Sequence, residues 1–437
     1  MNIFLKLFII ITIFGELMSA NSLPNYYTKT LKNGLEVVAI PMENGSNVVS
    51  VNVFYKVGSR DEIMGKSGIA HMLEHLNFKS TKNLKAGEFD EIVKGFGGVN
   101  NAGTSFDYTH YFIKTASKNT DKSLELFAEL MQNLNLKDKE FQPERDVVAE
   151  ERRWRTDNNP MGYLQFRLFN NSYIYHPYHW TPIGFMSDIQ NWKIEDIKDF
   201  HSRYYQPKNA IVVVSGDIKK DEVFSLVKKN FKDIKNKKDI SNSVHMVEPV
   251  QDGERRATIY KDSSVQMIAM AYHIPNFEHK DQVALSALSQ LLSSGKSSIL
   301  QKVLVDKKRL VNSIYAYNLE LKDPGLFIFM AVANENIDAL KIEKEILDII
   351  AQIQAGKVSK KDIDKIKINT KADFIYSLES SSDVASLFGN YFVRGNIKPL
   401  LEYEKNLESL TVEDIVNVAK KYLVSKNSTT IILKDDK

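Results

Sequence analysis

The sequence predicts an α+β protein built from two similar α/β sandwich halves that are joined by a linker. The chain has 437 residues, which is enough for two large domains. Runs of β-branched residues with period-two alternation are interleaved with segments of helical periodicity. A polar stretch rich in Lys, Asn and Asp interrupts this order at 236–256, and the order then repeats in outline.

In the first half, a strand pair is expected to precede a helix, and a second strand pair to precede two more helices. A looser segment that begins with Asn158-Asn159-Pro160 should follow, then a buried strand and a final helix. The expected strands are 34–41, 47–57, two within 96–115, and 210–216; the expected helices are 68–78, 119–134, 141–156 and one from 219; the looser segment is 157–186.

In the second half, strands are expected at 257–260, 266–273, 313–320, 326–333 and 428–433, and helices at 280–292, 336–354 and 360–374. The predicted domains are therefore 21–235 and 257–437. Residues 281–292 stand where the first half has its helix 68–78, and they contain neither histidine nor glutamate. The second half is thus expected to be a degenerate repeat that forms a wall or lid of the site.

The first twenty residues read as a secretory signal peptide. Lys6 precedes the short apolar run 7–14, and the segment that follows ends in small residues at Ala20, where cleavage is expected. The apolar run is too short for a comfortable membrane span, although an uncleaved anchor is the alternative. The protein is therefore expected to be exported, to the periplasm if bacterial and to the exterior otherwise.

Composition excludes several function classes. A net charge of +3 gives no support to nucleic-acid binding. The chain has no cysteine, which excludes disulfides, a thiol nucleophile, a thiolate zinc site and a lipid-modified cysteine.

The most informative motif is His71-Met72-Leu73-Glu74-His75, of the form H-x-x-E-H. On a helix, histidines four residues apart project from one face, which suits two nitrogen ligands on one Zn²⁺. Glu74 lies near that face and could act as a base on a metal-bound water without being a ligand. The alternative is an ordinary amphipathic helix in which these residues coincide.

A catalytic zinc site usually has three protein ligands and an open position, and Glu151 is the best third candidate. Segment 141–154 is expected to be helical, with Pro143 in its first turn. Glu144 and Glu151 lie two turns apart on one face, whereas Glu150 points away. The alternative is that all three glutamates are solvated surface charges.

These motifs resemble the pitrilysin family of zinc peptidases, which includes mitochondrial processing peptidases and insulin-degrading enzymes. The family carries H-x-x-E-H and, much later, an E-R-x-x-x-x-x-E helix, which matches Glu144-Arg145 to Glu151 here. The resemblance implies that His71, His75 and Glu151 bind zinc and that Glu74 is the general base in hydrolysis of a peptide bond. It implies that Glu144 supports a ligand without touching the metal, and that each half is a sheet covered by helices.

A third stretch, 97–111, resembles the family's G-G-x-x-N-A-x-T-x-x-D-x-T-x-Y pattern. Read from the residues, it is a glycine turn that feeds a strand with polar alternation. The resemblance implies that this edge strand binds the substrate backbone by strand addition, with Asn101 and Ala102 beside the cleaved bond. The alternative is that Asn100-Asn101 is only turn chemistry.

One departure from the family concerns partners. Single-chain members carry an Arg and a Tyr, seven residues apart, that bind substrate, but Val305 and Asn312 stand at those places here. The chain is therefore expected to be the zinc-bearing member of a heterodimer, or one copy in a homodimer, in which a related chain supplies the pair. The alternative function is a weakly active zinc-binding structural or chaperone-like subunit. His176 and His179 are expected to be surface or packing residues.

Overall fold

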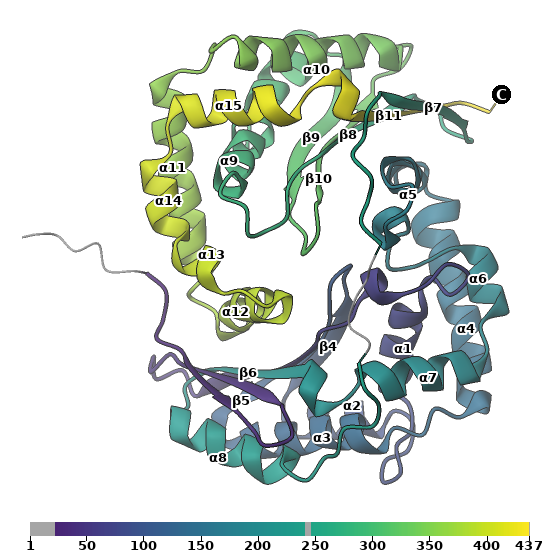
Figure 1. Cartoon of the computed structure of the whole chain (residues 1–437), viewed down its shortest axis with the longest axis vertical. Helices are drawn as coiled ribbons and strands as arrows, with labels where there is room; N and C mark the ends of the chain where they lie inside the picture. Colours follow the sequence, from purple (N-terminus) through teal and green to yellow (C-terminus); the bar gives the residue numbers. More distant parts are fainter. Residues whose placement is uncertain (1–21, 241–245, 437) are drawn as a thin grey trace, which may run out of the picture.

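Two β-sheets, each covered by helices on both faces, form the molecule. The computed structural model describes residues 22–240 and 246–436. Figure 1 shows the first sheet and its helices in the lower part of the view and the second sheet in the upper part. The expected α+β fold with two halves is confirmed. The predicted signal peptide, residues 1–20, lies outside the described residues.

The first sheet has six strands in the order β1-β2-β6-β3-β5-β4. β2 and β6 run parallel, and the other neighbours run antiparallel. β4 pairs with β5 alone and is therefore an edge strand. The strands are β1 (Tyr27–Thr30), β2 (Glu36–Pro41), β3 (Val48–Tyr55), β4 (Val99–Thr104), β5 (Thr109–Ala116) and β6 (Ala210–Gly216).

The second sheet has five strands in the order β7-β11-β8-β10-β9. β7 and β11 run parallel and the rest antiparallel. The strands are β7 (Arg255–Tyr260), β8 (Met267–His273), β9 (Val311–Leu319), β10 (Leu326–Ala333) and β11 (Ser428–Lys434). All the strands expected in the two halves are present, with ends that differ by a few residues at most.

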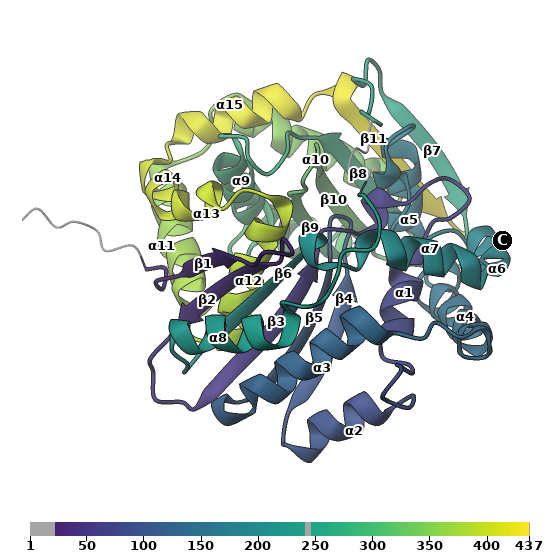
Figure 2. The same ribbon diagram turned by 60° about the horizontal axis from the view of Figure 1, so that its bottom comes forward.

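Helices of the first half are α1 (Ile69–Asn77), α2 (Glu88–Gly95), α3 (Thr120–Asn133), α4 (Asp138–Arg152), α5 (Pro160–Ser172), α6 (Met186–Asn191), α7 (Ile194–Tyr204) and α8 (Lys220–Phe231). Helices of the second half are α9 (Gln282–Ser293), α10 (Ala339–Gln354), α11 (Lys360–Tyr376), α12 (Ser381–Arg394), α13 (Lys398–Leu401), α14 (Tyr403–Ser409) and α15 (Val412–Tyr422). Figure 2 shows α3 and α8 lying along the outer face of the first sheet.

One helix from each half packs against the sheet of the other half. α12, from the second half, packs against β6 and β3 through a core that includes Phe54 and Phe388. α5, from the first half, packs against β8 and β11 through a core that includes Leu168 and Ile431. Because apolar faces on both sheets are covered this way, the halves share two of the four hydrophobic cores.

The expectation of a looser segment at 157–186 was wrong in its first half, which α5 occupies. Asn158-Asn159-Pro160 was read as loop chemistry, yet Asn159 is the N-cap of α5 and its side chain accepts from the Gly162 amide. Pro160 stands in the first turn, where its missing N–H is harmless. Residues that are typical of a loop therefore form the N-terminus of a helix here.

The expected helix 141–156 was right in type but wrong in its start. α4 begins at Asp138, so Pro143 lies inside the helix and not in its first turn. A π-helical turn, η3 (Arg153–Asp157), follows α4 directly. Helices α2, α6, α7 and α12 to α15 were not expected from periodicity.

Between Phe231 and Arg255, the described residues form neither helix nor strand. The predicted linker 236–256 and the domain limits on each side of it stay predictions. In residues 22–240 and 246–436, no helix combines the length and the apolar character that crossing a membrane requires.

Candidate metal centre

Helix α1 carries the two histidines of the motif on its solvent side. Its apolar positions, such as Met72 and Leu73, are fully buried in the first core. His71, Glu74 and His75 fall between these positions and so lie on the opposite, half-buried face. The helical spacing that predicted a shared face is confirmed by the closeness of the two imidazoles, whose ring centroids are 4.7 Å apart.

Glu62 fixes the start of α1. Gly68, the N-cap, has no side chain, and the carboxylate of Glu62 takes over the capping: it accepts from the amides of Gly68 at 2.8 Å and Ala70 at 2.9 Å. Trp180 donates its indole N–H to the same carboxylate at 2.7 Å. Glu62 is 1% exposed, so these bonds form in the interior.

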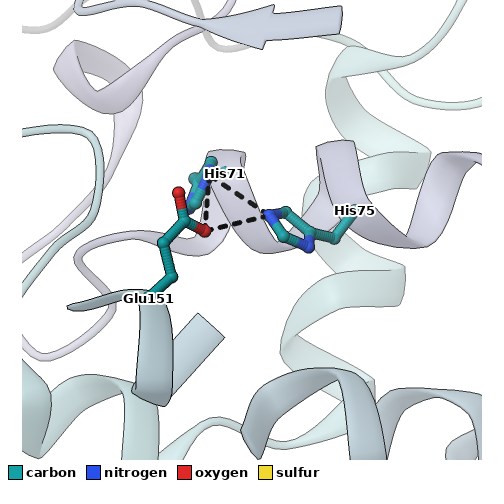
Figure 3. Close-up of side chains that lie close together, drawn as sticks. All are labelled: His71, His75 and Glu151. Atoms are coloured by element: carbon teal, nitrogen blue, oxygen red, sulfur yellow. Dashed lines mark hydrogen bonds and ion pairs between the residues drawn. The ribbon is translucent and has the colours of Figure 1, made fainter. Parts of the chain in front are cut away.

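Glu151, on α4, completes a triangle with the histidines (Figure 3). The Nε2 atoms of His71 and His75 are 3.3 Å apart, and Glu151 Oε2 lies 3.7 Å from the first and 3.4 Å from the second. Among the described residues, these three form the group of His, Cys, Asp or Glu side chains close enough to share one metal ion.

The triangle fits Zn²⁺. A tetrahedral ion with ligand bonds of about 2.0–2.1 Å separates its ligands by roughly 3.4 Å, which is the range observed here. Two imidazole nitrogens and one carboxylate oxygen are the donor set of many catalytic zinc sites, in which a fourth position stays open. The residues present therefore fit the ion that the motif predicts.

Three further side chains support this triangle, two by contacting it and one through Glu144. Glu144 accepts a hydrogen bond from His75 Nδ1 at 2.9 Å, and Lys79 pairs with the other oxygen of Glu144 at 2.6 Å. Arg155, on η3, forms an ion pair with Glu151, with Nε 2.9 Å from Oε1. Glu144 was expected to orient one of the histidines, and in the structure it contacts His75. Sequence reasoning missed Lys79 and Arg155.

The pKa values of the two histidines are shifted in opposite directions. Burial, and then the charge of His75, lowers the pKa of His71 to about 4. Burial also disfavours the charge on His75, but its hydrogen bonds with Glu144 and Glu151 outweigh burial and raise its pKa to about 9. Without a metal, His75 is thus the protonated ring, and a metal ion must displace that proton to bind.

Glu74 lies beside the triangle but outside it. Its carboxylate accepts from the Thr104 hydroxyl at 2.5 Å, and burial raises its pKa. Thr104 is on β4, so this bond ties α1 to the edge strand. Sequence reasoning had given Thr104 no role. A carboxylate with a raised pKa is a better proton acceptor at neutral pH than an ordinary glutamate.

A cavity of about 820 Å³ opens over these groups. Asn101 and Ala102, on β4, line one side, and α5 lines another with Gln165 and Phe166. Glu150 points out of the cavity, is exposed and pairs with Arg153. The expectation that Glu150 differs from its two neighbouring acids in this way is confirmed.

The other singled-out histidines lie away from the triangle. His176 is 3% exposed and bonds through Nε2 to Asp323 of the second half at 3.0 Å. His179 bonds through Nδ1 to the carbonyl of Tyr173 at 2.5 Å. Both are packing residues, which is one of the two roles expected from the sequence; the other was a surface position.

Comparison with known proteins decides the family. Residues 37–178 match the family described as insulinase (peptidase family M16), and residues 191–370 match the peptidase M16 inactive domain. A relative from Helicobacter pylori, the zinc protease PqqE, is 56% identical over 428 residues, which are 98% of this chain and 96% of that protein. The chain belongs to the M16, or pitrilysin, family of zinc metallopeptidases. The resemblance read from the motifs is confirmed.

Solved structures agree with this family assignment. The crystal structure of a protease from Helicobacter pylori superposes with a TM-score of 0.93 at 58% identity and covers 94% of this chain and 100% of its own. The periplasmic protease PqqL from Escherichia coli shares the fold at 20% identity and a TM-score of 0.76. That match covers 94% of this chain but only 47% of PqqL.

Two positions of the second half, Val305 and Asn312, were singled out in the sequence as the expected places of an Arg and a Tyr. Val305 lies in a π-helical turn, η6 (Gln301–Lys307), and packs against the core of the second half. Asn312, on β9, is exposed. Among the described residues, the second half has no group of side chains with metal-ligand spacing.

Proposed function

We propose that this member of the M16 family is a zinc-dependent endopeptidase that hydrolyses peptides or unfolded polypeptides. The observation that carries the proposal is the His71–His75–Glu151 triangle with Glu74 beside it at the floor of one cavity. A purely structural zinc site needs no base and keeps no open position, whereas this site has a candidate for the first and space for the second.

His71, His75 and Glu151 would hold the zinc ion. Once bound, zinc polarises the substrate carbonyl and makes water a nucleophile at neutral pH. Glu144 keeps the His75 ring in place by accepting from Nδ1, so that Nε2 points into the triangle. Glu74 takes the proton of the attacking water and delivers it to the leaving amine nitrogen. Thr104 holds the Glu74 carboxylate in position for both transfers.

The edge strand β4 is proposed to bind the substrate backbone. One side of β4 pairs with β5, and the other has no strand partner in the described sheet. Asn101 and Ala102 line the cavity, so a peptide added beside them would present a backbone carbonyl near the triangle. Strand addition reads the backbone and suits substrates of varied sequence.

A second chain is proposed to complete the site. Val305 and Asn312 cannot replace an Arg and a Tyr, and Val305 is packed into its own core. The match to half of PqqL supports the idea that two units of this size work together in some members of the fold. The related chain could be a second copy or a different protein. Full activity of the purified monomer would contradict this part of the proposal.

The N-terminal apolar run supports export, with the periplasm as the compartment if the source is bacterial. The second candidate function is a weakly active or inactive zinc-binding subunit. The replaced Arg and Tyr, and the match of residues 191–370 to a domain described as inactive, favour it. The intact base Glu74 speaks against it.

Cleavage of a quenched fluorescent peptide library, with and without a chelator, separates the two candidates. We expect Glu74→Gln to lower kcat by about 10²–10⁴-fold because the proton transfers lose their base. Glu150→Gln is the matched control, since Glu150 is exposed and outside the cavity, and its activity should equal that of the wild type. Bound zinc with no cleavage, alone or with the related chain added, would favour the inactive subunit.

A further inference from the structure

Arg155 stands at the proposed catalytic centre, where the proposed mechanism gives its free donors no task. It lies on the turn η3, immediately after α4, and lines the cavity together with the triangle. Its guanidinium forms an ion pair with Glu151, while the side chain remains 62% exposed. To the described residues, the terminal nitrogens make no hydrogen bond, so most of the guanidinium faces the cavity.

The turn that carries Arg155 is held firmly. Arg152 is buried, pairs with Asp157 at 3.0 Å, donates to the carbonyl of Gly184 and lies 4.0 Å above the ring of Phe166. At Gly162 a Cβ atom would come within 1.9 Å of the Arg155 carbonyl, so α5 and the turn are in direct backbone contact. π-helical turns of this kind often occur at functional sites.

Arg155 is the more exposed of the two cationic side chains that line the cavity. Two lining residues are cationic, and Lys79 is paired with Glu144. The lining acids are Glu74, Glu144 and Glu151. Glu74 and Glu144 already accept hydrogen bonds from neighbouring side chains, and Glu151 is paired with His75 and Arg155. A bound divalent ion would turn the balance of the cavity to net positive, which favours an anionic ligand.

We propose that Arg155 binds a carboxylate of the substrate beside the cleaved bond and so makes the enzyme prefer acidic peptides. This inference rests on the proposed peptidase function and names its substrate class. The planar guanidinium, with its remaining donors in a fixed fork, matches a carboxylate in geometry and charge. The carboxylate can come from an Asp or Glu side chain or from the peptide C-terminus, and both sources present the same chemistry.

The test measures peptide binding without turnover. Zinc-loaded protein with Glu74→Gln is mixed with labelled peptides that differ only in Asp against Asn near the bond the wild type cleaves. A second pair differs only in a free against an amidated C-terminus. The dissociation constants come from fluorescence anisotropy. We expect one acidic member to bind roughly 10-fold tighter or more than its neutral partner, and the pair that shows this identifies the source.

Variants assign the preference to Arg155. In the Glu74→Gln background, Arg155→Gln should abolish the difference between acidic and neutral peptides, whereas Arg155→Lys should keep part of it. Arg153→Gln is the matched control, because Arg153 lies on the same turn but pairs with Glu150 outside the cavity. This control should leave the preference unchanged. Zinc content is measured on every sample.

Three outcomes would overturn the proposal: equal affinity for acidic and neutral peptides, no binding of any peptide, or a loss in Arg155→Gln that is the same for both peptides. The last result, with reduced zinc, would mean that Arg155 only positions Glu151. Cleavage of the same peptides by the wild type distinguishes the two levels of inference. Cleavage without preference contradicts the role of Arg155 alone, whereas no cleavage contradicts the proposed function even if Arg155 selects acidic ligands.

Discussion

Side chains at the proposed site are held by contacts on more than one side. His75 has Glu151 on one ring nitrogen and Glu144 on the other, and Glu144 is itself neutralised by Lys79. The hydrogen bonds from His75 and Lys79 outweigh burial and lower the pKa of Glu144. An ionised Glu144 fixes the tautomer in which His75 Nδ1 carries the proton and Nε2 is free for a metal.

Glu144→Gln should therefore weaken zinc binding without removing a ligand. Loss of the charged partner of a metal-binding histidine typically costs about 10–100-fold in metal affinity. We expect the zinc dissociation constant, measured by competition with a chromogenic chelator, to rise by this factor at neutral pH. Glu150→Gln serves as the control and should show the wild-type affinity. An unchanged affinity in Glu144→Gln would mean that Glu144 does not support His75.

At the scale of elements, α1 is held by groups that come from other segments of the chain. Glu62 caps its first turn, and His75 in its last turn contacts α4. Between them, Thr104 on β4 donates a hydrogen bond to Glu74. The carboxylate of Glu62 meets three donors, from Gly68, Ala70 and Trp180. Burial raises the pKa of Glu62, whereas these three hydrogen bonds favour its ionised form.

Glu62→Gln is expected to destabilise the protein, because the amide group of Gln would turn a donor toward one of those three donors. The loss of a buried charge-assisted bond costs about 2 kcal/mol in the free energy of unfolding. Urea unfolding of the metal-free protein checks this as a lower midpoint with an unchanged m-value. Glu91→Gln, in the exposed first turn of α2, is the control and should change the free energy by less than about 0.5 kcal/mol. Equal midpoints for both variants would refute the capping role.

For the whole molecule, the two halves are held together by α5 and α12, which each pack on the sheet of the other half, and by a partly buried polar contact. α5 and α12 each complete a core in the other half. Asp323, in the β9–β10 connection, binds Arg60 at 2.5 Å and His176 at 3.0 Å, both from the first half. These partners outweigh burial and lower the pKa of Asp323 to about 2. The two halves are thus fixed relative to each other.

We expect a lower pH to decrease the free energy of unfolding, in part through a histidine that is buried in its neutral form. His201, in α7, is 5% exposed, and burial lowers its pKa to about 3. Its folded pKa lies below its unfolded value of about 6.5, so its contribution to stability is complete above that pH. The contribution is lost progressively as the pH falls toward 3, because only the unfolded chain then binds the proton.

We expect the free energy of unfolding of the metal-free protein to fall by up to about 1.4 kcal/mol per pH unit from this group below about pH 6. His201→Leu should remove that part of the slope between about pH 6 and 4 and leave the slope above pH 7 unchanged. Urea titrations at several pH values in the presence of a chelator provide the measurement. Parallel slopes for variant and wild type throughout would contradict the assignment.

Local sequence patterns were enough to predict α1, the strands and the residues of the triangle. H-x-x-E-H fixes its own geometry because helical spacing alone brings His71 and His75 together. Glu151 was found through its position relative to Glu144 on a second helix. Such features depend on periodicity within a segment, and a single sequence contains them in full.

Contacts between distant segments could not be predicted in the same way. No local pattern shows that Glu62 caps α1 or that Thr104 donates to Glu74. α5 was missed because Asn159-Pro160 starts a helix with the residues that commonly form a loop. Its role as cover for the second sheet depends on tertiary packing and is invisible in one segment.

Zinc-dependent peptide hydrolysis with Glu74 as base is the central claim, and a metal titration tests it most directly. Metal-free wild type and Glu74→Gln are titrated with Zn²⁺, together with the related chain if one is required, while bound zinc and cleavage of a fluorescent peptide are followed in the same samples. We predict that both proteins bind zinc in equal amount, and that cleavage rises with bound zinc in the wild type alone. Cleavage that is independent of zinc, or equal cleavage by Glu74→Gln, would contradict the claim.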